Sequence, residues 1–161
     1  MQSIQVRNIP MVALFMLVAL AGGACSSVAV RTAATSSSAQ YTNPAGTFIA
    51  MPSTAVTVNF GFDSTLIITF SARGVVSAPT PPATQTPIVF IKCQIDGNAC
   101  QPDVNPVEFL YPQFCCDSRS FTWVVQNVSA GQHTVAILWG MGNPTSASVS
   151  NRTLVVEAIR P

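Results

Sequence analysis

Cysteine is the residue type whose spacing says most about the chemistry of this chain. Four of the five cysteines lie in the second half of the sequence: Cys93, Cys100, Cys115 and Cys116. An even number of cysteines indicates disulfides in an exported chain, and residues 1–24 predict export, as argued below. Zinc is disfavoured because structural sites place about two to four residues between paired cysteines, whereas the intervals here are six, fourteen and zero residues. We predict two disulfides, no metal site and no cofactor.

The pairing of these cysteines depends on the turn predicted at Asp96-Gly97. A two-residue hairpin turn there would set Cys93 opposite Cys100, and opposed residues in an antiparallel ladder are within disulfide reach. That arrangement would leave Cys115 to bond its own neighbour Cys116, which is a strained bond. The sequence therefore favours the two long-range alternatives, in which Cys93 and Cys100 each bond one of the adjacent cysteines.

Ionisable side chains that would support acid–base catalysis are scarce. Charged residues make up 8% of the chain, against roughly 25% in an average globular protein. The one histidine, His133, shares a predicted strand face with Val135, Ile137 and Trp139, which favours a hydrogen-bonded residue at the edge of the core. No Gly-x-Ser-x-Gly elbow accompanies it, and the acids cannot be paired into a glycosidase site from the sequence. We predict that the protein is not an enzyme.

Asparagine and aspartate residues suggest two further chemistries. An oxygen-rich loop would offer calcium ligands from Asp96, Asn98, Asp103 and Asn105. Their spacing matches no EF-hand loop, so turn formation by Asx side chains explains them better. Asn127-Val-Ser129 and Asn151-Arg-Thr153 match the glycosylation acceptor pattern, which matters only in a host that has the glycosylation machinery.

Four aromatic residues would suit a sugar-stacking platform: Trp123, Trp139, Tyr111 and Phe114. Both tryptophans stand in register with aliphatic neighbours, which indicates burial in the core. Tyr111 and Phe114 lie in a predicted loop, 108–114, and are the better candidates for ligand binding. The net charge of the chain is only +1, whereas nucleic-acid binders carry a strong excess of positive charge. We therefore expect a surface glycan or a protein as the partner, and no nucleic acid.

Residues 1–24 have the features of a secretory signal peptide. Arg7 gives a weakly positive start, and the run from Met11 to Ala21 contains 11 apolar residues, short of the roughly 20 that span a bilayer as a helix. Small residues follow this run, so cleavage is expected near Ala21, Ala24 or Ala29. No second stretch is long and uncharged enough to span a membrane. The mature protein is predicted to be exported to an extracellular, periplasmic or cell-surface location.

Cys25 opens a second interpretation of this leader. A cysteine directly after an apolar run and small residues resembles a bacterial lipoprotein signal, in which that cysteine carries lipid. Such signals have leucine or a similar residue three positions before the cysteine, where this chain has Gly22. Lipidation of Cys25 therefore remains the alternative to ordinary cleavage.

The rest of the chain divides in two by composition. Residues 25–46 are rich in Ser, Thr and Ala and carry one charge, at Arg31, so we expect a flexible tether. Residues 47–161 alternate apolar and polar side chains, which is typical of antiparallel strands with one buried face. The clearest segments are 64–72, 88–96, 120–128, 132–139 and 151–159. We predict one all-β domain of about seven or eight strands, an antiparallel two-sheet β-sandwich of the immunoglobulin-like or jelly-roll type.

Two segments, Gly131-Gln-His-Thr-Val135 and Arg152-Thr-Leu-Val-Val-Glu157, resemble the closing strands of small exported bacterial β-sandwich proteins of unknown function. Ile67-Ile-Thr-Phe-Ser-Ala72 is similar to their early strand, and Ile95-Asp-Gly97 to their central hairpin. The resemblance spans residues 54–158. It implies the sandwich fold and an exported location, and it implies no activity. Taken together, the sequence predicts an exported, non-enzymatic β-sandwich domain with a binding or cell-surface structural role. The alternative is a carbohydrate-binding module that uses the loop around Tyr111 and Phe114.

Overall fold

The structure is a computed structural model that describes residues 28–41, 46–76, 88–100, 106–110, 117–142 and 146–161. These residues form ten β-strands and no helix. In chain order the strands are β1 (Val28–Thr35), β2 (Ala39–Tyr41), β3 (Ile49–Phe60), β4 (Ser64–Val76), β5 (Val89–Ile95), β6 (Asn98–Ala99), β7 (Val107–Leu110), β8 (Asp117–Val128), β9 (Gly131–Met141) and β10 (Ala147–Ile159).

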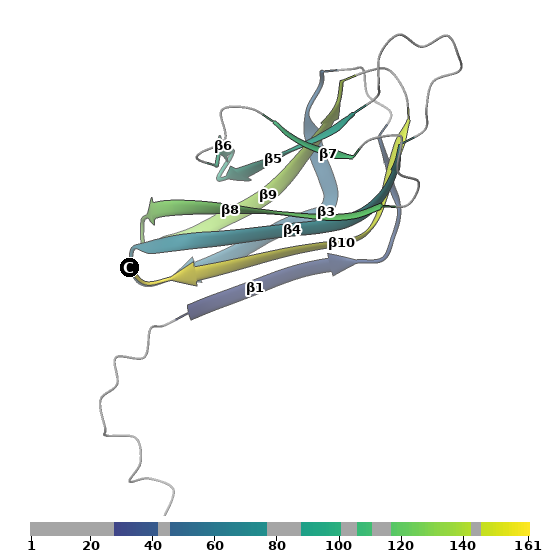
Figure 1. Ribbon diagram of the computed structural model, residues 1–161. Coiled ribbons are helices and arrows are strands. Elements are labelled where there is room, and N and C mark those ends of the chain that lie inside the picture. The colour runs from purple at the N-terminus through teal and green to yellow at the C-terminus, as the bar shows by residue number, and fades with distance from the viewer. Residues whose placement is uncertain (1–27, 42–45, 77–87, 101–105, 111–116, 143–145) are drawn as a thin grey trace, which may run out of the picture.

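The strands form two antiparallel sheets that pack face to face (Figure 1). Sheet A has the order β1-β10-β4-β8, with β2 paired to β10. Sheet B has the order β3-β9-β5-β6, with β7 paired to β5. The predicted all-β, two-sheet sandwich is confirmed, although the described ranges contain more strands than the expected seven or eight.

The core lies between the two sheets and is built from alternate residues of each long strand. In sheet A the side chains of Leu66, Ile68 and Phe70 are fully buried, and in sheet B those of Val135 and Ile137 are fully buried. Because successive side chains of a strand point to opposite faces, the residues between them face outward. The alternation in the sequence therefore identified the buried face of these strands correctly.

Both tryptophans belong to this core. Trp123 is 2% exposed and Trp139 is 0% exposed. The ring of Trp139 meets the ring of Tyr41 edge-on, with the centroids 5.4 Å apart. Since Trp139 lies in sheet B and Tyr41 lies in β2, which pairs with sheet A, this contact joins the two sheets. The prediction that the tryptophans are core residues is confirmed, and neither can serve as an exposed sugar platform.

The flexible tether predicted for residues 25–46 is wrong at Val28–Thr35 and Ala39–Tyr41, which are strands. Strand β1 pairs with β10 from Val28↔Ile159 to Thr35↔Arg152, and β2 pairs with the opposite end of β10. The small, weakly polar side chains suggested a linker, but β10 leaves an edge whose backbone groups need hydrogen-bond partners, and these strands supply them. The folded body therefore begins at least as early as Val28, so cleavage near Ala29 would cut into β1.

The Asp96-Gly97 hairpin forms as the sequence predicts. Asp96 has φ 52° and Gly97 has φ 82°, the pair of positive values that a tight type I′ turn requires. The turn joins β5 to β6 and aligns Ile95 with Asn98. The backbone N–H of Cys100 then donates to the carbonyl of Cys93, with N and O 3.0 Å apart.

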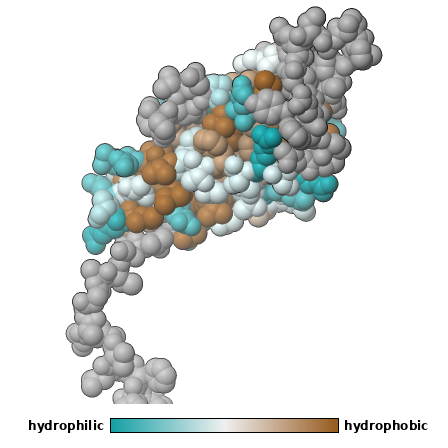
Figure 2. Space-filling view, in the orientation of Figure 1, coloured by the Kyte–Doolittle hydropathy of each residue, from teal (hydrophilic) through white to brown (hydrophobic). Residues whose placement is uncertain are grey.

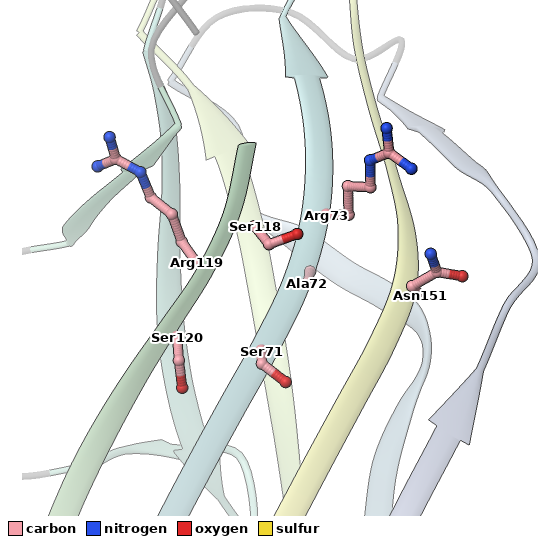
Figure 3. Close-up of a pocket in the computed structure, with 7 residues that line it drawn as sticks. All are labelled: Ser71, Ala72, Arg73, Ser118, Arg119, Ser120 and Asn151. Carbon is pink, nitrogen blue, oxygen red and sulfur yellow. The ribbon is translucent and has the colours of Figure 1, made fainter. Parts of the chain in front are cut away.

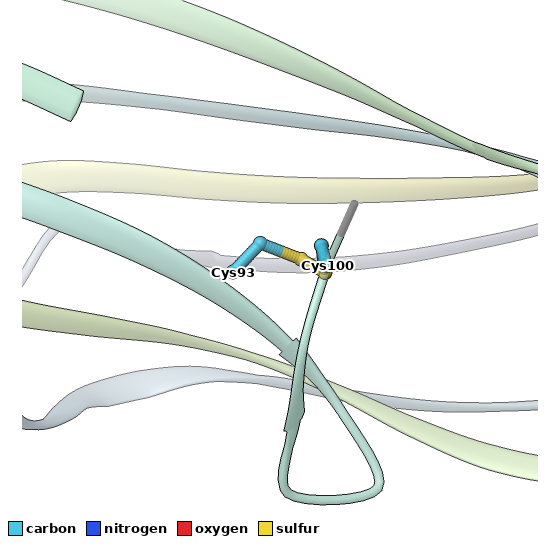
Figure 4. The surroundings of a disulfide bond; sticks show 2 residues. All are labelled: Cys93 and Cys100. Atoms are coloured by element: carbon cyan, nitrogen blue, oxygen red, sulfur yellow. A yellow bond between two sulfur atoms is a disulfide. The ribbon is translucent and has the colours of Figure 1, made fainter. Parts of the chain in front are cut away.

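This register decides the disulfide. Cys93 bonds Cys100, with Cα atoms 5.3 Å apart (Figure 4). The long-range pairing that the sequence favoured for these two cysteines is therefore wrong. The two-residue turn places Cys93 and Cys100 opposite each other, within disulfide distance. Cys115 and Cys116 lie outside the described residues.

No helix in the described ranges is long and apolar enough to cross a membrane. The predicted signal peptide, residues 1–24, and the predicted lipidation residue Cys25 lie outside those ranges. Export and lipidation therefore stay predictions from the sequence.

Candidate functional site

The outer face of sheet A carries hydroxyl side chains in register across three strands. Thr153 of β10 lies beside Ser71 of β4, which lies beside Ser120 of β8. In the next row of outward-facing side chains, Thr69 of β4 is paired with Thr122 of β8, and their hydroxyl oxygens are 3.0 Å apart. We call the outer side of β10, β4 and β8 around these five residues the hydroxyl face. The side of the molecule visible in Figure 2 has mostly weakly polar and hydrophobic residues, with strongly hydrophilic residues in separate patches.

A depression of about 310 Å³ opens at one end of the hydroxyl face (Figure 3). It is lined by Ser71, Ala72, Arg73, Ser118, Arg119, Ser120 and Asn151. Figure 3 shows the guanidinium of Arg73 reaching toward β10, on the side where Asn151 lies, while Arg119 points away past β8. Arg73 therefore brings positive charge over this depression.

A bulge in β10 shapes the depression. The register between β10 and β4 shifts between Ser150 and Thr153, and Asn151 takes a left-handed φ of 48°. We call Asn151 and Arg152 the β10 bulge. At this bulge the exposed Asn151 is followed by Arg152, which is 1% exposed. A β-bulge commonly re-aims a side chain in this way.

A second depression, of about 250 Å³, lies on the other side of Asn151. It is lined by Ala34, Thr35, Ser36, Asn151, Arg152 and Thr153. The two depressions therefore meet at the β10 bulge and extend the polar surface from β8 across to the end of β1. An open surface of this length suits an extended ligand better than a small enclosed one.

Arg152 is a buried cation at the β10 bulge, with the same inward alternation as Leu154 and Val156. Its Nη1 donates to the carbonyl of Val149 at 2.8 Å, and its Nη2 lies 3.4 Å from the hydroxyl of Ser37. Its Nε has no hydrogen-bond partner, and it forms no ion pair with the residues that the structure describes. Burial lowers the pKa of this guanidinium from its ordinary value, because removal from water disfavours the charged form.

Several side chains at the first depression are available to a ligand. Within the described ranges, the side chains of Ser71, Arg73, Ser118 and Asn151 make no hydrogen bond with one another or with their surroundings. Ser120 donates to the carbonyl of Phe70 at 3.2 Å and so keeps acceptor capacity. Among the described residues that line either depression there is no carboxylate or imidazole. This arrangement can bind hydroxyl, carbonyl or anionic groups.

His133 lies in β9 of sheet B, the opposite sheet from this surface, and has a structural role. Its ring stacks on Phe60, with centroids 5.3 Å apart. Its Nδ1 lies 2.7 Å from Oδ2 of Asp96, and its Nε2 lies 2.9 Å from the carbonyl oxygen of Ser129. A catalytic imidazole would present Nε2 to a nucleophile, whereas here a backbone carbonyl takes that place. The interpretation of His133 as a hydrogen-bonded residue at the core edge is confirmed.

Asp96 is engaged by protein groups rather than poised for calcium. Its Oδ1 accepts the backbone N–H of Thr134 at 2.7 Å, and its Oδ2 contacts His133. Both oxygens therefore hold the β5–β6 hairpin against the start of β9. Among the other residues of the oxygen-rich loop, Asp103 and Asn105 lie outside the described ranges. In the described part of the chain no group of three or more His, Cys, Asp or Glu side chains is placed to hold a metal.

The engagement of Asp96 predicts a weaker fold in acid. The N–H of Thr134 and the ring of His133 hold the pKa of Asp96 below its ordinary value of 3.8. Because the folded state has the lower pKa, ionised Asp96 stabilises the fold above pH ~4, and this contribution is lost as the pH falls through the folded-state pKa. Between pH ~5 and pH ~2.5, the melting temperature of the Asp96→Asn variant should therefore fall by less than that of the parent.

Thermal denaturation followed by circular dichroism checks this expectation. Glu157→Gln serves as the control, because Glu157 makes no hydrogen bond or ion pair within the described residues. The control should keep the parental pH dependence. An Asp96→Asn curve that is parallel to the parental curve would show that this carboxylate does not link folding to pH.

The sequence-predicted ligand residues, Tyr111 and Phe114, lie outside the described residues, as do Cys115 and Cys116. The residues that form the hydroxyl face were missed, although the sequence does carry a signal for them. Ser and Thr alternate with apolar residues in 64–72 and 118–122, but only the register shows that these hydroxyls are neighbours.

No protein-family model and no curated protein sequence matches this chain. Among solved structures, the chain is similar to one described as "EclA C-terminal domain; sugar-binding protein". The match has a TM-score of 0.40 and 9% sequence identity, and it covers 74% of this chain and 77% of that chain. At this level of similarity the match bears on neither the fold nor the function of this chain.

Proposed function

We propose that this chain is an exported, non-enzymatic binding domain that holds a glycan on the outer face of sheet A. The observation that carries the proposal is the in-register set of hydroxyls on three strands, next to unengaged polar side chains at the β10 bulge. Hydroxyl and amide groups both donate and accept hydrogen bonds. They match the alternating donors and acceptors of a sugar chain, and a rigid sheet holds them in fixed positions.

The export part of this proposal rests on the sequence. The apolar run Met11–Ala21 and the small residues after it predict removal of a leader. A bound diacylglycerol on Cys25 would make the domain a lipid-anchored one. The intact mass of the protein recovered from outside the cytoplasm distinguishes cleavage, lipidation and retention of Met1.

Removal of two hydroxyls from the hydroxyl face is expected to weaken glycan binding. Ser71→Ala combined with Ser118→Ala deletes two side chains that have no partner within the described residues. Each lost hydrogen bond costs about 0.5–1.5 kcal/mol, so the affinity should fall by roughly tenfold. A glycan array with neutral and acidic sugars selects the ligand, and titration calorimetry measures the change.

Sheet B provides a matched control for this experiment. Thr57 and Thr134 form an exposed pair on its outer face, with hydroxyl oxygens 3.4 Å apart. Thr57→Ala combined with Thr134→Ala removes the same chemistry from the other side of the sandwich and should leave binding unchanged. Equal loss in both double variants, or binding to no glycan, would contradict the proposal.

The loop predicted at Tyr111 and Phe114 is the rival location for a carbohydrate site. It follows β7, which ends at Leu110. Tyr111→Ala combined with Phe114→Ala would abolish binding if that loop carries the site, and the two serine substitutions would then have no effect. The comparison of the two double variants locates the site.

A further inference from the structure

We infer that the ligand carries an anionic oxygen group, which binds between Arg73 and Asn151 at the β10 bulge. This inference rests on the proposed glycan-binding function and specifies the class of glycan, namely one that bears carboxylate, sulfate or phosphate groups.

Arg73 is the first reason. It is exposed, lines the depression, and makes no ion pair within the described residues. Figure 3 shows its guanidinium directed toward β10, and the hydroxyl of Ser118 pointing from β8 toward β4. A guanidinium offers several N–H donors in a planar fork that fits carboxylate, sulfate and phosphate oxygens. In a chain with 8% charged residues, an unpaired arginine among hydroxyl and amide groups is a specific feature.

Arg152 is the second and independent reason. It is a buried cation at the same bulge, it lines the second depression, and its Nε has no partner among the described residues. A buried charge is costly without a counter-ion. Asn151 lines both depressions, so an anion seated beside it would lie between the depression that Arg73 lines and the one that Arg152 lines. Screening by water is weaker near a buried charge, which strengthens the attraction from that side.

The distribution of charge along the outer face orients such a ligand. Glu157 lies further along β10, on the same outward side as Thr153 and Val155, and pairs with Ile67 of β4. A negative side chain at that end disfavours a second anionic group there. The anionic group should therefore sit at the β10 bulge, and the neutral part of the sugar chain should extend over Thr69 and Thr122.

Arg73→Gln tests the inference with three probes: neutral cellohexaose, tetragalacturonate and a sulfated chondroitin hexasaccharide. The parent should bind at least one acidic probe more tightly than the neutral probe, and this preference should shrink as salt is raised. Arg73→Gln should lower affinity for that acidic probe by about tenfold or more while changing neutral binding by less than about twofold. Arg73→Lys should retain part of the affinity, because it keeps the charge and loses the fork.

Arg160→Gln is the matched control. Arg160 is exposed, follows the last residue of β10, and contacts the ring of Phe62 at the opposite end of this strand from the bulge. Arg160→Gln removes the same charge from the chain. A loss of acidic-probe affinity that occurs only in Arg73→Gln therefore reports the site and not the net charge. Circular dichroism checks that each variant is folded, and Asn151→Gly, which tolerates the left-handed φ at this position, provides a second variant if Arg73→Gln is not.

The outcomes separate the inference from the proposed function. Equal binding of neutral and acidic probes, unaffected by Arg73→Gln, would overturn the anionic ligand and leave glycan binding standing. Failure of every sugar to bind would overturn the proposed function. Sulfate titration followed by NMR then decides the anion site alone: shifts of the Arg73 Nε–H and the Asn151 amide that vanish in Arg73→Gln support it, and their absence overturns it.

Discussion

Trp139→Ala is expected to lower the free energy of unfolding by about 3–5 kcal/mol, the usual cost of deleting a buried aromatic ring. Trp139 is fully buried in β9, which lies between β3 and β5 in sheet B. Its ring also contacts Tyr41 of β2 across the sandwich. The substitution would therefore leave a cavity and remove a contact between the two sheets. Urea denaturation followed by far-ultraviolet circular dichroism measures the loss.

Two further substitutions control this experiment. Phe121→Ala removes an aromatic ring that is 36% exposed, so it should cost much less, about 1 kcal/mol. Trp139→Phe keeps an aromatic ring, and it loses no indole hydrogen bond because Nε1 of Trp139 has no partner within the described residues. It should cost less than the alanine substitution. A Trp139→Ala variant as stable as Phe121→Ala would contradict the assignment of Trp139 to the centre of the core.

Loss of the Cys93–Cys100 disulfide is expected to cost about 2–3 kcal/mol, since a short closed loop restricts the unfolded chain less than a long one. The two cysteines are separated by seven positions and are 0% and 1% exposed. Cys93→Ala combined with Cys100→Ala removes the bond while keeping small apolar side chains. Its unfolding free energy, compared with that of the parent under non-reducing conditions, gives the contribution.

Peptide mapping without reduction supplies the control for the pairing. The parent should yield Cys93 and Cys100 in one linked species. A link from the peptide containing either residue to the peptide containing Cys115 and Cys116 would contradict the observed bond. It would restore the long-range pairing that the sequence alone favours.

The local sequence was sufficient for the strands and for much of the core. The alternation in 64–72 predicted the burial of Leu66, Ile68 and Phe70, because the two faces of a strand are separated by a period of two residues. Asp96-Gly97 predicted its own turn, because both residues tolerate positive φ. The core-edge position of His133 followed from its place beside Val135 on one strand face. Each of these features depends on residues close together in the chain.

Only the tertiary structure decided the features that depend on pairing between distant strands. Residues 28–41 have the composition of a linker, and they become β1 and β2 because β10, more than a hundred residues later, offers its backbone edge. The hydroxyl face exists because Thr153, Ser71 and Ser120 fall into one row across three strands. The β10 bulge, which exposes Asn151 and buries Arg152, appears only as a shift of register against β4. Periodicity specifies which face of a strand is polar, whereas the alignment of one strand with another is set by long-range packing and hydrogen bonding.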